Sequence, residues 1–281
     1  MATAAHMAYC ADLVRAADRA RYLSALYAPE PARAHLHALY AFDAETAKIG
    51  DVVHEPMAGE IRLQWWRDVI AGERDGEAAA NPVAAALLEA VRSANLPRQL
   101  LFDLIEARSF DLYRDPMPTV DAFTGYADKT SGTIIDLAAR VLSGAPLGAI
   151  RLHVAFADMT LRELAALGQR AAHGRIYLPL EIMQPFGADP NTLLAGQVNA
   201  EMRAALANLA LRARTHLDHA EALLGGIDAA ALPALLPLAG ARRRLQHREQ
   251  SADPLPSDDL APWRRQWAIW RAAHDPRRLF Q

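Results

Sequence analysis

The chain has 281 residues, of which 52% are hydrophobic and 22% are charged, so its composition is that of a globular protein and not of a disordered one. Its formal net charge of -3 gives no electrostatic reason to expect nucleic acid as a partner. The single cysteine, Cys10, cannot form an intramolecular disulfide; we expect a buried thiol and a reducing, cytoplasmic location. The sequence shows no secretory signal pattern and no apolar run of membrane-spanning length, so any membrane contact is expected to be peripheral.

Taken in chain order, the sequence predicts helices throughout, because alanine, leucine, arginine and glutamate dominate and β-branched runs are scarce. Proline-containing breaks at 28–31 and 114–119 separate helices, and Thr119 is a plausible N-cap. The segment 251–262 is predicted to be a polar loop. The expected helices cover about 6–27, 31–54, 57–72, 82–94, 97–113, 120–143, 147–172, 192–224, 231–247 and 262–273.

Strands that alternate with helices are not apparent, and no internal repeat or low-complexity linker divides the chain. We therefore predict an all-α fold, a single-domain helical bundle that spans residues 1–281.

Common catalytic motifs are absent from the sequence: it contains no phosphate-binding glycine loop, no GxSxG, no CxxC and no HExxH. His216 and His219 are helical neighbours, but no third metal ligand suggests itself for them.

Carboxylate pairs are the feature that would carry magnesium chemistry in a helical protein. Helical enzymes that ionise allylic diphosphates need Mg²⁺, held by carboxylates one turn apart on facing helices. Asp43 and Asp51 are eight residues apart, with Ala47 and Lys48 one turn before Asp51. In the helix at 147–172, Asp158 and Glu163 are five residues apart and lie on different faces. Neither helix therefore carries the expected pair.

A resemblance to a known family is carried by a series of short segments in a fixed order. The chain resembles the squalene/phytoene synthase family, whose fold is an isoprenoid-synthase-type helical bundle around a central pocket. The matching segments are Leu39-Tyr40-Ala41-Phe42, the Trp-Trp-Arg helix at 61–68, residues 103–108 with 111–113, Tyr126 to Thr133, and Gly174-Arg175-Ile176-Tyr177-Leu178-Pro179.

Departures from this resemblance lie in the two acidic motifs. The first motif falls on residues 47–51, where Ala47 and Lys48 replace acids and only Asp51 is retained. The second falls on residues 166–170, where all three acids are replaced, by Ala166, Gln169 and Arg170. This pattern resembles the branch of the family related to a mitochondrial assembly factor for respiratory complex I. The resemblance implies a non-catalytic protein without a metal or other cofactor, which acts through protein or lipid contacts at the inner membrane.

Two alternatives belong to other classes of function. The chain could be a prenyl transferase that condenses isoprenoid diphosphates with Mg²⁺ held by Asp43, Asp51 and Asp158, or a carrier that holds an isoprenoid or lipid in its cavity. Lys48, Arg170 and Arg175 would hold an anionic head group, unless they pair with surface acids. Asp51 itself is expected to be buried and paired with Lys48 or an arginine. The resemblance implies these ligand-binding positions: Asp51, Tyr126, Gly132, Arg170, Arg175 and Tyr177.

Tryptophans form two further features. Trp65 and Trp66 are either core residues, which we favour, or walls of an apolar pocket. Trp263, Trp267 and Trp270 form one stripe on the last helix. We expect this stripe to dock onto the bundle, because three exposed tryptophans are costly; the alternative is an interfacial helix with its arginines on anionic lipid.

Overall fold

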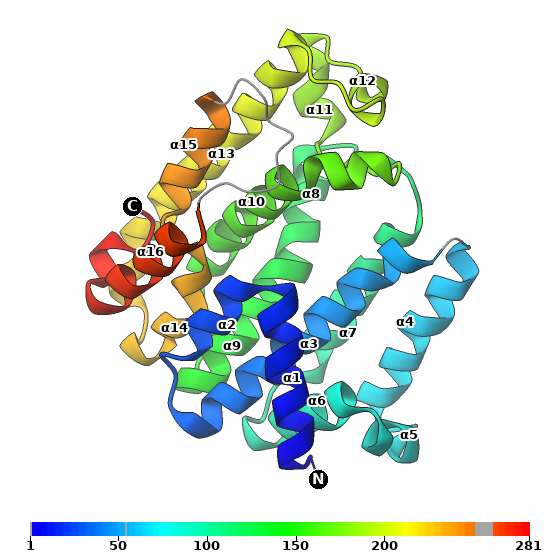
Figure 1. Ribbon diagram of the computed structural model, residues 1–281, viewed down its shortest axis with the longest axis vertical. Coiled ribbons are helices and arrows are strands. Elements are labelled where there is room, and N and C mark those ends of the chain that lie inside the picture. The colour runs from blue at the N-terminus through cyan, green and yellow to red at the C-terminus, as the bar shows by residue number, and fades with distance from the viewer. Residues whose placement is uncertain (1, 54, 251–260) are drawn as a thin grey trace. The chain divides into compact units, whose positions relative to one another are not determined.

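The regular structure of this protein is helical (Figure 1). The computed structural model describes residues 2–53, 55–250 and 261–281, and these ranges contain no strand, which confirms the all-α prediction. The chain divides into two compact units: residues 1–113, 133–148 and 227–237 form unit 1, and residues 114–132, 149–226 and 238–281 form unit 2. Each unit thus combines stretches that are far apart in sequence. The expectation of one domain over 1–281 stays a prediction.

Unit 1 is built around the long helix α3. Its apolar residues at helical spacing, Leu36, Leu39 and Phe42, are fully buried, and α3 packs against α1, α6 and α9 of the same unit. The α-helices of unit 1 are α1 (Ala4–Ala17), α2 (Arg19–Ala25), α3 (Glu30–Val52), α4 (Pro56–Ala71), α5 (Asp75–Ala80), α6 (Pro82–Ser93), α7 (Arg98–Arg108), α9 (Thr133–Ser143) and α14 (Leu232–Leu235), and η1 (Ser109–Leu112) and η5 (Ala229–Ala231) are 3₁₀ turns.

Unit 2 is built around α10, which packs against α13 and α15. Val154, Phe156 and Leu161 are among the residues of α10 that fill the core of this unit. Its α-helices are α8 (Val120–Ala127), α10 (Ile150–Ala172), α11 (Leu180–Met183), α12 (Pro190–Leu194), α13 (Ala200–Leu223), α15 (Ala241–Gln250) and α16 (Pro262–His274), with a π-helical turn η2 (Asp128–Gly132) and the 3₁₀ turns η3 (Gln184–Phe186), η4 (Leu224–Gly226) and η7 (Pro276–Arg278). The 3₁₀ turn η6 (Leu236–Leu238) lies where the chain passes from unit 1 to unit 2.

Three predicted helices are broken or shortened by local signals. The helix expected at 6–27 divides at Asp18, whose backbone is non-helical. Its carboxylate accepts a hydrogen bond from the Arg21 backbone N–H at 3.0 Å and so caps α2. The helix expected from 192 begins at 200 behind the side-chain cap of Asn199. The helix expected at 231–247 is interrupted at Gly240, whose φ of +72° ends one turn and starts another.

The helix predicted at 120–143 is replaced by α8, the π turn η2 and α9. The N-cap prediction for Thr119 is confirmed, because its hydroxyl accepts from the Ala122 backbone N–H at 3.0 Å. Within η2, the Thr130 hydroxyl donates to the Tyr126 carbonyl at 2.6 Å, a local bond that competes with regular helix geometry. The predicted loop at 251–262 lies, up to residue 260, outside the described residues.

Over the described ranges, no helix is long and apolar enough to cross a bilayer.

Candidate functional site

The first motif lies near the end of α3. Ala47 is half-buried, and Lys48 and Asp51 are exposed. The expectation of a buried Asp51 is wrong: α3 ends at Val52, so Asp51 is in its last turn and reaches solvent. The one acid that is retained from this motif therefore lies on an exposed helix end.

Asp43, one turn before Ala47, lies in a buried ion-pair network within unit 1. Its two carboxylate oxygens accept from Arg21 Nη1 at 2.5 Å and from Arg108 Nη2 at 2.7 Å, and Asp43 is only 5% exposed. Arg108 also pairs with Asp111 at 3.3 Å, and Arg21 lies over the Tyr40 ring. Two guanidinium groups thus neutralise this carboxylate and occupy both of its oxygens.

The second motif lies on α10 in unit 2. Ala166 is half-buried and Gln169 is exposed. Arg170 pairs with the buried Glu163, and its guanidinium lies 4.6 Å from the ring centroid of Tyr177. Tyr177 in turn contacts Tyr126, with ring centroids 5.6 Å apart. The structure therefore brings together three residues that were predicted to bind a ligand, Tyr126, Arg170 and Tyr177. Arg170 is paired with an acid, as one of the two interpretations expected, but this acid is buried and does not lie on the surface.

Asp158 and Glu163 do not act as a pair on α10. Asp158 accepts from the Ser131 hydroxyl at 2.9 Å and forms an ion pair with Arg162 Nε at 2.7 Å. Because Glu163 pairs with Arg170 instead, the two acids point to separate cationic partners.

Gly132 allows η2 to lie close to α10. A β-carbon at this position would be 3.0 Å from the Ala155 β-carbon and 3.0 Å from Asp128 Oδ1, so only a glycine leaves room for this contact. The implied ligand-binding role of Gly132 stays a prediction. Arg151 reaches Asp128 at 2.9 Å beside it. Arg175 is half-buried in the loop after α10.

A magnesium site of the family type does not fit these residues. Mg²⁺ needs several oxygen ligands, but the motif positions provide one acid, Asp51, together with alanine, lysine, glutamine and arginine. The buried acids Asp43, Asp158 and Glu163 are bound by arginine. Among the described residues, no group of three or more His, Cys, Asp or Glu side chains is arranged to hold a metal ion.

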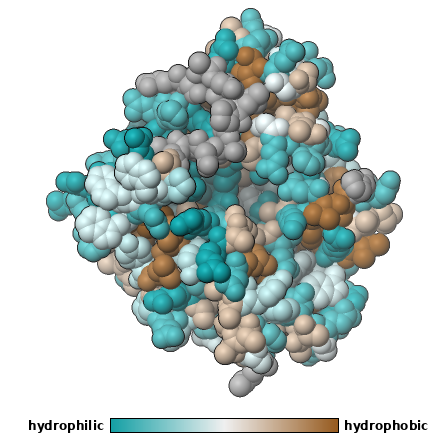
Figure 2. All heavy atoms as spheres, viewed as in Figure 1, coloured by the Kyte–Doolittle hydropathy of each residue, from teal (hydrophilic) through white to brown (hydrophobic). Residues whose placement is uncertain are grey.

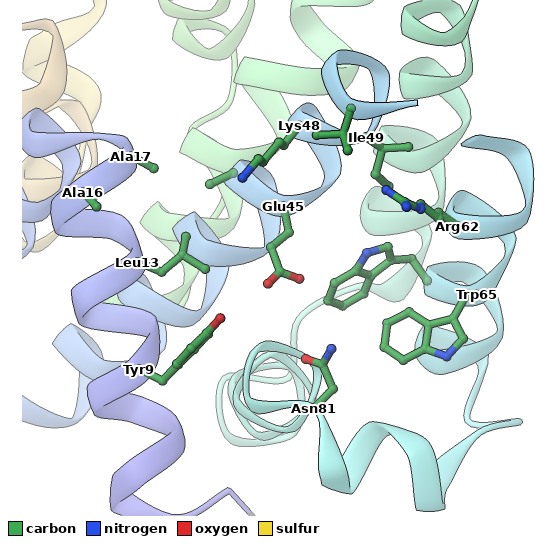
Figure 3. Close-up of a pocket in the computed structure, with 13 residues that line it drawn as sticks. Tyr9, Leu13, Ala16, Ala17, Glu45, Lys48, Ile49, Arg62, Trp65 and Asn81 are labelled. Atoms are coloured by element: carbon green, nitrogen blue, oxygen red, sulfur yellow. The ribbon is translucent and has the colours of Figure 1, made fainter. Parts of the chain in front are cut away.

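A pocket of about 810 Å³ lies entirely within unit 1, between α1, α3, α4 and the start of α6 (Figure 3). From α3 it is lined by Ala44, Glu45, Lys48, Ile49 and Val52. Ala47 and Asp51 of the acidic motif are not among its lining residues. The pocket thus shares Lys48 with the motif but does not include the positions of Ala47 and Asp51.

Aromatic side chains form one wall of this pocket. Trp66 is buried and packs edge-on against Phe42, with ring centroids 5.0 Å apart. Trp65 is half-buried, and its Nε1 donates to Glu77 Oε2 at 2.7 Å, which fixes the indole. Both tryptophans line the pocket, so the pocket-wall interpretation is right for both residues and the core interpretation holds for Trp66 alone.

The tryptophan stripe of α16 faces solvent. Trp263, Trp267 and Trp270 are 64%, 49% and 52% exposed, while Ala268 and Ile269 form the buried side of the helix. In Figure 2 a pale group of side chains covers α16 and is bordered by hydrophilic residues. The expectation that the stripe docks onto the bundle is wrong, because the small and aliphatic residues of α16 make that contact instead.

Three histidines gather between α10 and α13, a cluster that sequence spacing could not show. His153 Nδ1 lies 3.1 Å from His216 Nδ1, and the His153 ring lies 5.0 Å from that of His219. The sequence suggested His216 and His219 as neighbours but not His153, because His153 lies 63 residues before His216. The ring of His216 also stacks on Phe156, at a centroid distance of 4.1 Å.

Curated relatives with recognisable similarity fall into two groups. The complex I assembly factor 6 of Bos taurus is 29% identical over 230 residues, which cover 81% of this chain and 69% of that protein. The corresponding human protein is 26% identical over the same shares. The 15-cis-phytoene synthase of Synechocystis sp. is 26% identical over 217 residues, which cover 71% of this chain and 63% of that protein.

Solved structures show the same fold. A dehydrosqualene synthase superposes with a TM-score of 0.81 at 18% identity and covers 96% of both chains. A squalene synthase from Alicyclobacillus acidocaldarius superposes with a TM-score of 0.74 at 21% identity, over 90% of this chain and 95% of that one. The sequence pattern of the squalene/phytoene synthase family matches residues 14–271. This chain therefore belongs to the squalene/phytoene synthase family.

Proposed function

We propose that this protein is a non-catalytic member of its family that serves in the assembly of a respiratory membrane complex. The observation that carries the non-catalytic assignment is the state of its acids: the motif carboxylates other than Asp51 are replaced, and Asp43 and Asp158 are bound by arginines. The assembly role is supported by the similarity to complex I assembly factor 6 of several animals.

Relocated acids do not support the alternative of an active prenyl transferase. For Asp43 to bind Mg²⁺, Arg21 and Arg108 would have to release it and would then be left buried without their carboxylate. Asp158 would likewise have to leave Arg162 and Ser131. Of these three acids, Asp43 and Asp158 are buried and Asp51 is exposed. A single exposed carboxylate does not supply the several ligands that Mg²⁺ requires.

The residues of α16 suit contact with a membrane surface. The helix carries Arg264, Arg265 and Arg271 but no acid, next to its three exposed tryptophans. Indole rings suit the interfacial zone of a bilayer, and each arginine near an anionic surface contributes about 1 kcal/mol of binding free energy. We therefore propose that the protein binds anionic lipid peripherally through α16, at the inner membrane that houses the complex it would serve.

Catalysis is tested by incubating the purified protein with farnesyl or geranylgeranyl diphosphate over a titration of Mg²⁺, with an active phytoene synthase as the positive control. We expect no condensation product at any magnesium concentration. Magnesium-dependent turnover above background would refute the non-catalytic assignment.

Assembly is tested by deleting the gene in its own organism and resolving respiratory complexes on native gels. We expect loss of assembled complex I, restored by the wild-type gene and equally by a variant that carries Asp51→Ala. Normal complex I in the deletion strain would contradict the assembly role.

Membrane binding is tested with sedimented vesicles of neutral or anionic composition. The variant Trp263→Ser/Trp267→Ser should bind anionic vesicles at least about tenfold more weakly than the wild type. A matched control is Leu211→Ser, which removes another exposed apolar side chain, on α13. Equal binding by all three proteins, or no preference for anionic vesicles, would argue against α16 as the contact.

A further inference from the structure

The pocket of unit 1 has features of a ligand site that includes Lys48 of the degenerate first motif but not Ala47 or Asp51. On a helix with 100° per residue, Glu45, Ile49 and Val52 point about 140–160° away from Ala47. The volume of about 810 Å³ is that of sites for small organic molecules.

Glu45 is a half-buried acid of this pocket. Burial raises the pKa of its carboxyl, and Lys48 offsets this rise only in part. Across the described ranges, Glu45 has no hydrogen-bond or ion-pair partner. Figure 3 shows its carboxylate directed from α3 into the space bordered by Tyr9 and Asn81. A half-buried carboxylate in an aromatic-walled pocket is complementary to an ammonium group, which both the acid and the indole faces attract.

Lys48 and Arg62 give the pocket a second, cationic end. Both are exposed, and neither is held by a hydrogen bond or ion pair to any described residue. In Figure 3 they lie nearer the opposite end of the pocket from Tyr9 and Asn81. Lys48 comes from α3 and Arg62 from α4, and both are exposed, charged side chains that line the pocket. Ammonium and guanidinium groups are both suited to bind a phosphate.

The charges exclude simpler ligands. A purely anionic ligand would be repelled by the Glu45 carboxylate, and a purely cationic ligand would be repelled by Lys48 and Arg62. A plain hydrocarbon chain would bury Glu45 further without a partner, at a cost in desolvation. We propose that this pocket binds a zwitterion that carries an ammonium and a phosphate a few bonds apart, as in phosphoethanolamine or the phosphatidylethanolamine head group. Leu13, Ile49 and Val52 leave apolar surface for the start of an attached chain.

The test is calorimetric titration of the full-length protein with phosphoethanolamine, with inorganic phosphate and with ethanolamine. We expect phosphoethanolamine to bind at least about tenfold more tightly than either fragment. Glu45→Gln should remove this advantage and leave phosphate binding no weaker than in the wild type, because the change also removes a negative charge. Lys48→Ala/Arg62→Ala should abolish phosphate binding. Glu30→Gln, an exposed acid in the first turn of α3, and Arg19→Ala, an exposed cation on α2, serve as matched controls and should bind as the wild type.

The two sources of this chemistry are separated by a short-chain phosphatidylethanolamine below its micelle concentration. Tighter binding of this lipid than of phosphoethanolamine identifies a membrane lipid, and equal binding identifies a free soluble zwitterion; both outcomes support the site. Phosphoethanolamine that binds no tighter than phosphate, or equally to wild type and Glu45→Gln, overturns it.

A measurement on the wild type avoids any loss of fold in the variants. Of the five tryptophan indole N–H resonances, those of Trp65 and Trp66 should shift on titration while those of α16 stay in place. A shift confined to the α16 tryptophans would contradict the assignment. The inference does not depend on the proposed assembly role.

Discussion

At the scale of single residues, buried acids outside the two motifs have arginine partners. Asp43 lies between Arg21 and Arg108 in the core of unit 1, and Glu163 is paired with Arg170 in unit 2. A buried carboxylate held by arginine is costly to free, because the guanidinium would be left without its partner. The same residue type that carries magnesium in a synthase therefore stabilises the fold here.

Asp43→Ala tests this role. The change leaves Arg21 and Arg108 without their shared carboxylate, so we expect the free energy of unfolding to fall by roughly 3–5 kcal/mol. Urea denaturation measures the loss, and Glu106→Ala, an exposed acid on α7, should change stability by under about 0.5 kcal/mol. A loss for Asp43→Ala as small as that of the control would show that the network contributes little.

At the scale of helices, two contacts in unit 2 join elements that are separated in sequence. The π turn η2 carries Gly132 against α10, and α10 meets α13 through the cluster of His153, His216 and His219. Sequence periodicity predicts helical structure for these segments, but it does not show which of them lie side by side in the fold.

Gly132→Ala should destabilise the protein by about 1–3 kcal/mol, because the new β-carbon would overlap Ala155 and Asp128. Gly125→Ala, at a helical glycine with nothing within 4 Å of an added β-carbon, should be neutral or stabilising. Thermal unfolding of the two variants decides the point: an equal midpoint for both would mean that η2 shifts freely away from α10.

The histidine cluster predicts a loss of stability in acid. Burial and the neighbouring His153, His219 and Arg212 lower the pKa of His216 from 6.5 to about 4. The folded state therefore binds fewer protons than the unfolded state between these values, so stability is present above pH 6.5 and is lost as the pH falls towards 4. The contribution is roughly 1–2 kcal/mol once solvent screening of these partly exposed rings is allowed for.

Unfolding free energies measured from pH 7 to pH 4 test this dependence. His216→Gln should lose stability less steeply than the wild type, although burial also lowers the pKa of His37 to about 4 and leaves part of the slope. The exposed His247→Gln should follow the wild type. An unchanged slope in His216→Gln would rule out the cluster as its source.

At the scale of the whole molecule, a synthase fold is maintained without the carboxylates of a synthase. The family match covers residues 14–271, and the fold agrees with that of a dehydrosqualene synthase at a TM-score of 0.81. The fold rests on buried apolar residues such as Phe42, Phe123 and Phe156, which do not depend on the metal site. Loss of the acids is therefore compatible with retention of the bundle.

Metal removal should accordingly leave the stability of the protein unchanged. A metal that binds only the folded state raises the melting temperature, so we expect equal Tm values in excess Mg²⁺ and in EDTA, with and without inorganic diphosphate. A phytoene synthase treated in parallel should show a higher Tm with magnesium and diphosphate. A rise in Tm for this protein of more than about 2 °C would indicate a magnesium site and contradict the proposal.

The sequence by itself determined the all-helical class, the family and the missing acids, because each depends on residue type and short spacing. Helix starts at Thr119 and Pro262 follow from local capping and proline geometry, and Ala47, Ala166, Gln169 and Arg170 are read directly at motif positions. Only the tertiary structure decided what the remaining acids do. Asp43 meets Arg108 across 65 residues of chain, and Glu45 faces Tyr9 and Asn81 from other helices. The exposure of Asp51 and of the α16 tryptophans was likewise decided by packing, since periodicity identifies an apolar face but not which face the neighbouring helices cover.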